Sequence, residues 1–397
     1  MSERHLPVRP DLTQLKHQAK DLLREMKRER PNAKLAEAQF ELARSYGVES
    51  WPRLALACRI IDAIWKDDVA TVRTIVTNHP RLLHEAARGV KGCNWGAPMS
   101  YAANVGRNQI ISMLHDLGAK DLTHALGRAL LQGKIETAQL LQRLGARAPR
   151  ETIVGCAEAL NDRGMAYAFE FGGDIGDDER LAATAMVLET YSRFPEGKHR
   201  CLELLAQHGV ALPDTPPMAL HRGRIDLLQD HLRRDPDLLT RTFPYSDIYP
   251  ASLGCHADET LGLHGTPLSG ATLLHMCVDF DEVDIARWLL DHGMPVDARA
   301  IVDADGFGGH TALFGCVVSF PHLNGRQKDA SFARMLLDRG ADPNARASLR
   351  KSLRFSDDPT LHEYPDVTPL AWGHRFHNKG MVSEPAMRLI AERGGHV

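Results

Sequence analysis

Residues 270–298 read GATLLHMCVDFDEVDIARWLLDHGMPVDA, and their apolar spacing predicts two short helices joined by a turn. The apolar residues that share a face are Leu274, Cys277 and Val278 in the first helix and Ile285, Trp288 and Leu289 in the second. The Thr272 hydroxyl can cap the first helix, and His275 can bond back to that cap or to a neighbouring unit. Gly293 stands where the second helix must end in a left-handed conformation. Such a unit cannot bury its apolar face alone, so neighbouring units must stack on it.

The helix start at Thr272–His275 and the later Leu289-Leu290-x-x-Gly293 resemble an ankyrin repeat. Related starts occur at residues 97–103, 311–313 and 368–370. The resemblance implies an all-α ankyrin-repeat solenoid of stacked helix–turn–helix units, with an N-terminal helical cap and long inserted finger loops. It also implies a protein partner, bound by finger tips and by the concave face of the first helices.

Residues 1–60 differ from the repeats and are mildly basic, with 12 Lys and Arg against 8 Asp and Glu. The segments RPDLTQLKHQAKDLL (9–23) and AKLAEAQFELARSYGVESWPRL (33–54) resemble a leader found ahead of ankyrin arrays in bacterial proteins. That resemblance implies a bacterial source. We expect this helical leader to cap the apolar end of the array; an arm that docks on nucleic acid or protein is the alternative.

The remaining chain is interpreted as two sub-arrays. Residues 61–212 contain degenerate ankyrin repeats, and residues 213–397 contain repeats with long loop insertions. The boundary is placed at PDTPP (213–217), after which residues 219–239 repeat the ending of the first unit. A single continuous solenoid is the alternative.

Composition excludes several classes of protein. The formal net charge of −3 does not support a general polyanion-binding surface, so a nucleic-acid partner is not expected. The seven scattered cysteines contain no C-x-x-C pair and fit small core residues in a reducing compartment. No apolar run approaches the roughly 20 residues of a membrane span, and the N-terminus lacks the apolar core of a secretory signal. The sequence therefore predicts a cytoplasmic protein without a membrane partner.

Three inserted fingers, residues 240–269, 298–310 and 346–367, are the predicted binding region, because long structured loops on a rigid scaffold usually carry function. Their aromatic and basic side chains are the candidate contacts. The predicted binding residues are Phe243, Tyr245, Tyr249, Phe307, Arg350, Arg354, His362 and Tyr364.

A catalytic alternative follows from the 20 histidines, many of them in the second half of the chain. The residues that could act as acid, base or metal ligands there are His256, Asp258, His264, Asp305 and His310. The sequence contains no H-E-x-x-H, G-x-S-x-G or phosphate-binding loop, so no metal site and no cofactor are predicted. The acidic residues 279–284 are expected to solvate the turn between two helices and to favour the second helix.

The predicted function is a recognition scaffold that binds a protein partner through the fingers and concave face of the C-terminal repeats. The alternative is a small-molecule or catalytic site, of hydrolase or lyase type, under the 240–269 loop. Whether the chain is an enzyme stays open. The alternative requires two of the imidazoles and a carboxylate to converge in a closed pocket, whereas the scaffold predicts an open groove.

Overall fold

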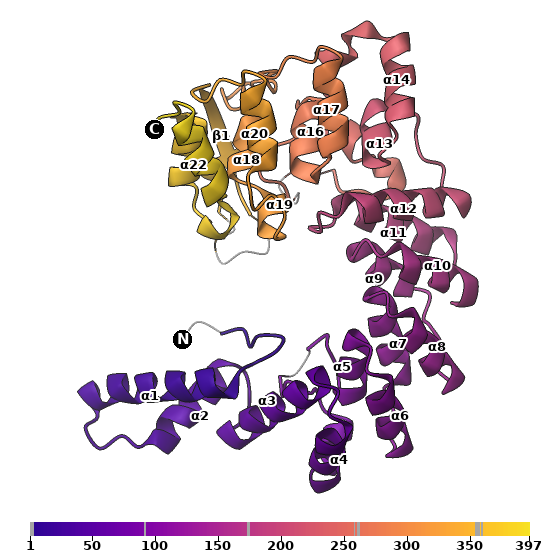
Figure 1. Cartoon of the computed structure of the whole chain (residues 1–397), viewed down its shortest axis with the longest axis vertical. Helices are drawn as coiled ribbons and strands as arrows, with labels where there is room; N and C mark the ends of the chain where they lie inside the picture. Colours follow the sequence, from indigo (N-terminus) through magenta and orange to yellow (C-terminus); the bar gives the residue numbers. More distant parts are fainter. Residues whose placement is uncertain are drawn as a thin grey trace. The chain divides into compact units, whose positions relative to one another are not determined.

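A computed structural model of the chain describes residues 4–90, 93–172, 175–257, 259, 263–353, 358 and 360–397. These residues are mostly helical (Figure 1). They divide into two compact units: unit 1 contains Met1–Cys156 and Arg163–Ile175, and unit 2 contains Ala157–Asp162 and Gly176–Val397. Among the described residues, no helix has both the length and the apolar character that crossing a bilayer requires.

The first ten α-helices belong to unit 1, apart from the end of α9 and the first residue of α10. They are α1 (Leu12–Glu29), α2 (Leu35–Ser45), α3 (Trp51–Trp65), α4 (Val69–Asn78), α5 (Pro98–Val105), α6 (Asn108–Asp116), α7 (Leu122–Leu131), α8 (Ile135–Arg143), α9 (Thr152–Glu158) and α10 (Asp162–Phe171), with a 3-10 turn η1 (Pro80–Leu83). The pairs α3–α4, α5–α6 and α7–α8 follow one another along the chain, and α3, α5 and α7 pack in that order (Figure 1).

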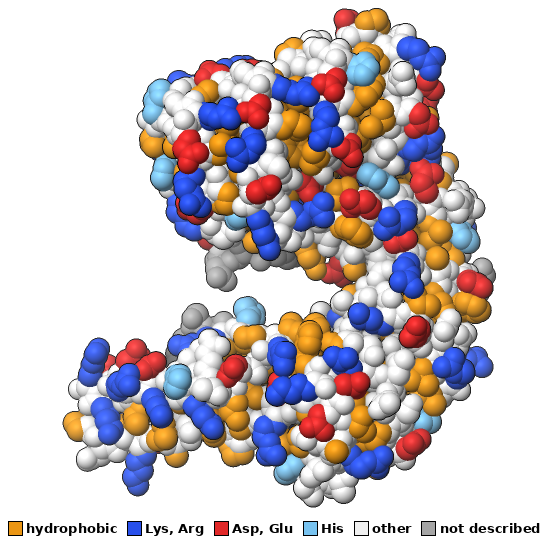
Figure 2. Space-filling view, in the orientation of Figure 1, with side chains coloured by type: hydrophobic (Ala, Val, Ile, Leu, Met, Phe, Trp, Pro, Cys, Tyr) orange, Lys and Arg blue, Asp and Glu red, His pale blue; other side chains and the backbone are white. Residues whose placement is uncertain are grey.

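The predicted leader forms α1 to α3. The Asp11 side chain caps α1 by accepting the N–H groups of Thr13 and Gln14, and Ser50 caps α3. Leu15, Leu42 and Leu54 share one buried core that joins these three helices. Figure 2 shows Lys and Arg side chains gathered over α1 and α2, as expected for a solvated basic face.

Unit 2 contains the remaining helices and a β-ribbon. Its helices are α11 (Asp177–Glu189), α12 (Pro195–Gln207), α13 (Pro216–His221), α14 (Ile225–Arg234), α15 (Tyr245–Ile248), α16 (Leu273–Phe280), α17 (Val283–Asp291), α18 (Ala312–Val317), α19 (Phe320–Leu323), α20 (Ser331–Asp338), α21 (Pro369–Arg375) and α22 (Glu384–Glu392), with 3-10 turns η2 (Pro236–Leu239), η3 (Ala251–Leu253) and η5 (Lys379–Met381). The first helices α13, α16, α18 and α21 pack in that order, each beside the next repeat.

The repeat at α16 and α17 has the predicted local structure. Thr272 and His275 form the cap of α16: the Thr272 N–H lies 3.3 Å from His275 Nδ1. His275 Nε2–H then donates to the His310 carbonyl at 3.0 Å, which joins this repeat to the next one. Leu289 is fully buried, and Gly293 has the expected left-handed φ of +96°.

The inserted segments are structured rather than open loops. Residues 240–269 contain α15 and η3, and residues 346–367 contain an antiparallel ribbon, β1 (Ala347–Lys351) with β2 (His362–Val367). Residues 298–310 form a short hairpin whose Gly308 N–H donates to the Ser348 carbonyl on β1. The fold is therefore mostly helical but includes a β-ribbon that the all-α prediction did not contain.

The boundary between the two compact units lies in residues 157–176, whereas the sequence placed a sub-array boundary near residue 213, inside unit 2. Pro216 and Pro217 of the PDTPP stretch begin helix α13. Thr215 caps α13 by accepting the Met218 N–H, and Pro216 occupies the first turn, where its missing N–H costs no hydrogen bond.

Candidate functional site

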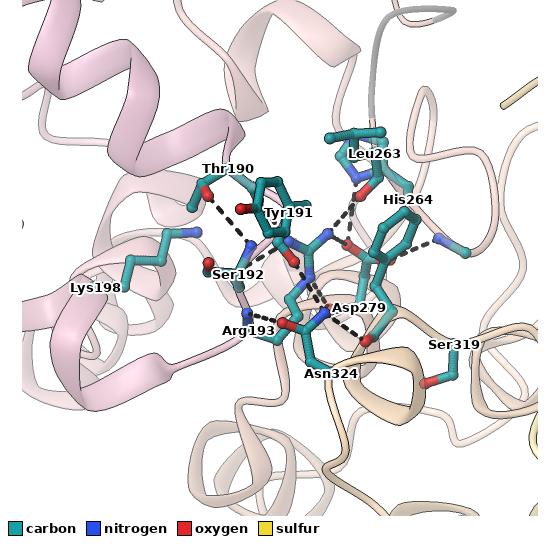
Figure 3. A network of polar contacts seen from close by, with 12 residues as sticks. Thr190, Tyr191, Ser192, Arg193, Lys198, Leu263, His264, Asp279, Ser319 and Asn324 are labelled. Atoms are coloured by element: carbon teal, nitrogen blue, oxygen red, sulfur yellow. Dashed lines mark hydrogen bonds and ion pairs between the residues drawn. The ribbon is translucent and has the colours of Figure 1, made fainter. Parts of the chain in front are cut away.

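A buried guanidinium organises the core of unit 2 beneath the 240–269 insertion. Arg193 lies in the link between α11 and α12, and its Nη2 is 2.9 Å from the Asp279 Oδ2 atom at the end of α16 (Figure 3). Its other N–H groups donate to the carbonyls of Thr190 (2.7 Å), Leu263 (2.5 Å) and Asp279 (2.7 Å). Arg193 therefore fastens the insertion and α16 to the same link.

His264 continues this network from the insertion. Its Nδ1 lies 3.3 Å from the Asp279 Oδ2, and its ring stacks on Tyr249 with centroids 5.4 Å apart. Burial alone would raise the pKa of the Asp279 carboxyl, but Arg193, His264 and the Gly265 N–H hold that pKa below its usual range. Burial lowers the pKa of His264 despite Asp279. The neutral imidazole thus donates from Nδ1, and Nε2 is a buried acceptor without a partner among the described residues.

A cavity of about 900 Å³, called the inner cavity below, lies next to this network in unit 2. Aromatic and aliphatic side chains form most of its wall, and carboxylates, amides and imidazoles supply the polar groups. The lining residues are Glu158, Met186, Glu189, Thr190, Tyr191, Tyr245, Tyr249, His256, Leu263, His264, Phe320, Leu323, Asn324, Leu353, Asn378 and Met381.

Glu189, at the end of α11, positions His256 at this cavity. Its carboxylate accepts the His256 backbone N–H at 2.6 Å and lies 2.8 Å from the ring Nδ1. The inner cavity therefore brings together two of the predicted imidazoles, His256 and His264, with two carboxylates. Those carboxylates are Glu158 and Glu189 and not the predicted aspartates.

A second cavity of about 610 Å³, called the finger cavity, lies among the three inserted segments. Phe307, His310 and Arg350 contribute to its lining. The Arg350 guanidinium lies 5.0 Å from the Phe307 ring centroid, and it forms ion pairs with Asp303 (2.7 Å) and Asp305 (2.9 Å). Arg350 is therefore fixed at the edge of this cavity by contacts within two fingers.

The five predicted catalytic residues do not form one site. His256 and His264 line the inner cavity, but His310 lines the finger cavity and donates from Nε2 to the Pro267 carbonyl at 3.1 Å. Asp305 is occupied by Arg350. Asp258 lies outside the described residues.

Most of the predicted aromatic anchors are core residues rather than exposed contacts. Phe243, Tyr245, Tyr249 and Tyr364 are buried, because their segments fold back on the repeats and fill gaps between them. Phe243 pairs with Ala271 through the backbone, and the Tyr364 hydroxyl lies 2.7 Å from His377 Nδ1. Phe307 and Arg350 remain at the surface.

The last two predicted binding residues are His362 and Arg354. His362 at the start of β2 is half-buried, with its Nε2 2.7 Å from the Asp358 carboxylate. Arg354 lies outside the described residues.

The sequence predicted that the acidic residues at the turn after α16 solvate that turn. In the structure most of them are buried instead. Asp279, Asp281 and Glu282 are each buried. Asp279 binds Arg193, Asp281 binds Arg326 and Gln327, and Glu282 lies 2.7 Å from His199. Basic side chains from distant segments reach the turn, and repeat spacing alone does not predict such partners.

Sequence reasoning missed Arg193, Glu158 and Glu189. The one available signal was the acidic cluster itself, since carboxylates beside an apolar helix need buried cationic partners. Among the described residues, no three His, Cys, Asp or Glu side chains are grouped so that they could hold a metal ion.

Comparison with known proteins identifies one segment of the chain. The family model described as "Ankyrin repeat" matches residues 269–301, so this segment is an ankyrin repeat. A solved structure, that of the human ASB11 ankyrin repeat domain, is 15% identical and covers 76% of this chain and 99% of its own, with a TM-score of 0.27. No curated protein sequence matches the chain.

Proposed function

We propose that the chain is a recognition scaffold that binds a protein partner through its inserted fingers. Ankyrin repeats generally mediate protein–protein interactions, and residues 269–301 are such a repeat. The finger at 298–310 begins at the end of this repeat, and the finger at 346–367 follows the next helix pair, α18 and α20. They surround the finger cavity, which makes them the natural contact region of unit 2.

The observation that carries this proposal is a group of exposed aliphatic side chains on two separate fingers. Ile301, Val302 and Leu361 are 57%, 55% and 56% exposed, and Ile301 and Leu361 line the finger cavity. Together with Phe307 and Arg350 they define the finger surface. Large apolar side chains that gather around a cavity mark an interaction site, because their exposure to water is unfavourable.

Arg350 gives the finger surface a polar rim. The two aspartates hold its guanidinium in one orientation over Phe307, so little side-chain entropy is lost when a partner binds. An apolar centre with a fixed charged rim is the arrangement found in protein interfaces. The partner is therefore a protein segment that presents apolar side chains to the cavity.

A phage-displayed random peptide library, panned on the purified chain, tests the proposal. We expect enriched peptides rich in apolar residues, with affinity reduced about tenfold or more by Ile301→Asp and by Leu361→Asp. Leu35→Asp is the matched control, because Leu35 is also an exposed leucine but lies at the start of α2. Equal binding by the finger variants and the control variant would exclude the finger surface.

A further inference from the structure

The polar groups of the inner cavity are suited to a cation. Two carboxylates line it, Glu158 and Glu189, and so does His264, whose lowered pKa leaves its imidazole uncharged. No Lys or Arg side chain is among the described residues that line it. The Tyr191 hydroxyl, 3.3 Å from Glu158 Oε1, leaves the second oxygen of that carboxylate for a ligand.

Cations close to this cavity are already engaged. The Arg193 guanidinium donates to the carbonyls of Thr190, Ser192, Leu263 and Asp279 and to the Asp279 carboxylate, so none of its five N–H groups is left for an anion. Lys198 is fully buried, with its Nζ 2.6 Å from His221 Nδ1, and it does not line the cavity. The His256 ring lines the cavity but is already paired with Glu189 at 2.8 Å, so an anionic ligand would meet the Glu158 carboxylate with no free cation among the described lining residues.

The wall of the inner cavity is suited to the apolar part of such a ligand. Tyr191, Tyr245, Tyr249 and Phe320 contribute aromatic rings, and rings of this kind attract a positive charge through the negative faces of their π systems. The volume of about 900 Å³ is within the usual range for small-molecule sites. A cavity of this size has room for an ammonium group together with an extended apolar body.

We propose that the inner cavity binds a small organic ammonium compound with an apolar body. The ammonium group lies beside Glu158 and Glu189, and the apolar body packs against the tyrosine and phenylalanine rings. This site is separate from the finger surface, and its test does not depend on a protein partner.

Isothermal titration of the purified full chain with three probes of similar shape tests the charge preference. The probes are 4-phenylbutylamine (cationic), 4-phenylbutanol (neutral) and 5-phenylvalerate (anionic). We expect the amine to bind about tenfold more tightly than the carboxylate, with the alcohol between them. Binding of the carboxylate at least as tight as that of the amine would overturn the proposal.

Substitutions locate the site. Glu158→Gln and Glu189→Gln should each weaken amine binding about three- to tenfold and leave alcohol binding unchanged, because only the charge is removed. Glu136→Gln, at an exposed glutamate on α8, is the matched control and should have no effect. Unchanged amine affinity in both cavity variants would overturn the proposal.

Two further measurements check the location of the site and the class of its ligand. Leu323→Lys adds a cation at an exposed position of the cavity lining, where folding is little affected, and should also weaken amine binding. Nα-acetyl-lysine amide represents the side chain of a protein partner. If it binds more tightly than 4-phenylbutylamine, the cavity receives a lysine from a protein, and the small-molecule assignment is wrong.

Discussion

At the scale of single residues, the charged groups buried in unit 2 have the largest energetic consequences. Arg193→Ala would leave the Asp279 carboxylate buried without its guanidinium partner. We expect a loss of about 3–5 kcal/mol in the free energy of unfolding, measured with urea. Arg200→Ala is the control: Arg200 also forms an ion pair, with Asp162, but its side chain is 53% exposed, so its loss should cost about 1 kcal/mol or less. Equal losses of unfolding free energy in the two variants would show that Arg193 and Asp279 do not form a buried ion pair.

Lys198 gives a prediction about alkaline pH. Burial, assisted by Arg193, lowers the pKa of this amine from 10.5 to about 7. Between those values the unfolded chain binds a proton that the folded chain does not, so this residue lowers stability as pH falls from 10.5 to about 7.

Lys198→Met removes that contribution. The variant should gain most over the natural chain at about pH 7, and its advantage should shrink by roughly 1 kcal/mol per pH unit as pH rises toward 10.5. Urea unfolding of both proteins across this range checks the slope. If the difference in stability between the variant and the natural chain does not change with pH, the Lys198 amine is not held neutral by burial.

The fold of the 240–269 insertion determines how much Tyr249 contributes to stability. As an exposed finger residue it would tolerate replacement by alanine, but in the structure it is fully buried against His264 and Tyr245. Tyr249→Ala should therefore cost about 3–5 kcal/mol, as Leu289→Ala in the core of α17 should cost about 2–5 kcal/mol. Thermal melts of the two variants compare these losses. If Tyr249→Ala melts at the same temperature as the natural chain, Tyr249 is exposed and the buried position is wrong.

At the scale of elements, the His275–His310 contact joins two repeats and makes their packing sensitive to acid. Burial lowers the pKa of His275 from 6.5 to about 4 and that of His310 to about 3. The unfolded chain takes up protons first as pH falls below 6.5, so stability is fully present above 6.5 and is lost toward pH 4.

We expect His275→Gln to reduce this acid sensitivity, since glutamine does not titrate there. The dependence of urea stability on pH should become shallower between 6.5 and about 4 in the variant. An unaltered slope in His275→Gln would show that this imidazole is not buried in the neutral form.

The repeat elements could be predicted from sequence, whereas the inserted elements could not. Local rules place Thr272, His275 and Gly293 at their caps, because each contact spans a few residues or one repeat. The partners of the insertion are far apart: Arg193 and Asp279 are separated by 86 residues. Spacing rules predict neither such contacts nor the β-ribbon at 347–367, which depends on pairing between segments.

At the scale of the whole molecule, the insertions add two cavities to a stack of helix pairs. Both cavities belong to unit 2, in the half of the chain where the sequence analysis placed the function. The inserted segments predicted from sequence contribute residues to both cavities, but Phe243, Tyr245, Tyr249 and Tyr364, predicted as exposed contacts, are buried. The reason is physical: an insertion long enough to fold back also buries its own apolar residues.

The most direct test of partner recognition is amide hydrogen exchange of the full chain with and without a peptide selected on it. We predict slower exchange at residues 298–310, 346–353, 358 and 360–367, the described parts of two fingers, with little change in α5 and α7 of unit 1. Protection confined to α5 and α7, with the fingers unchanged, would contradict the finger surface as the site of recognition.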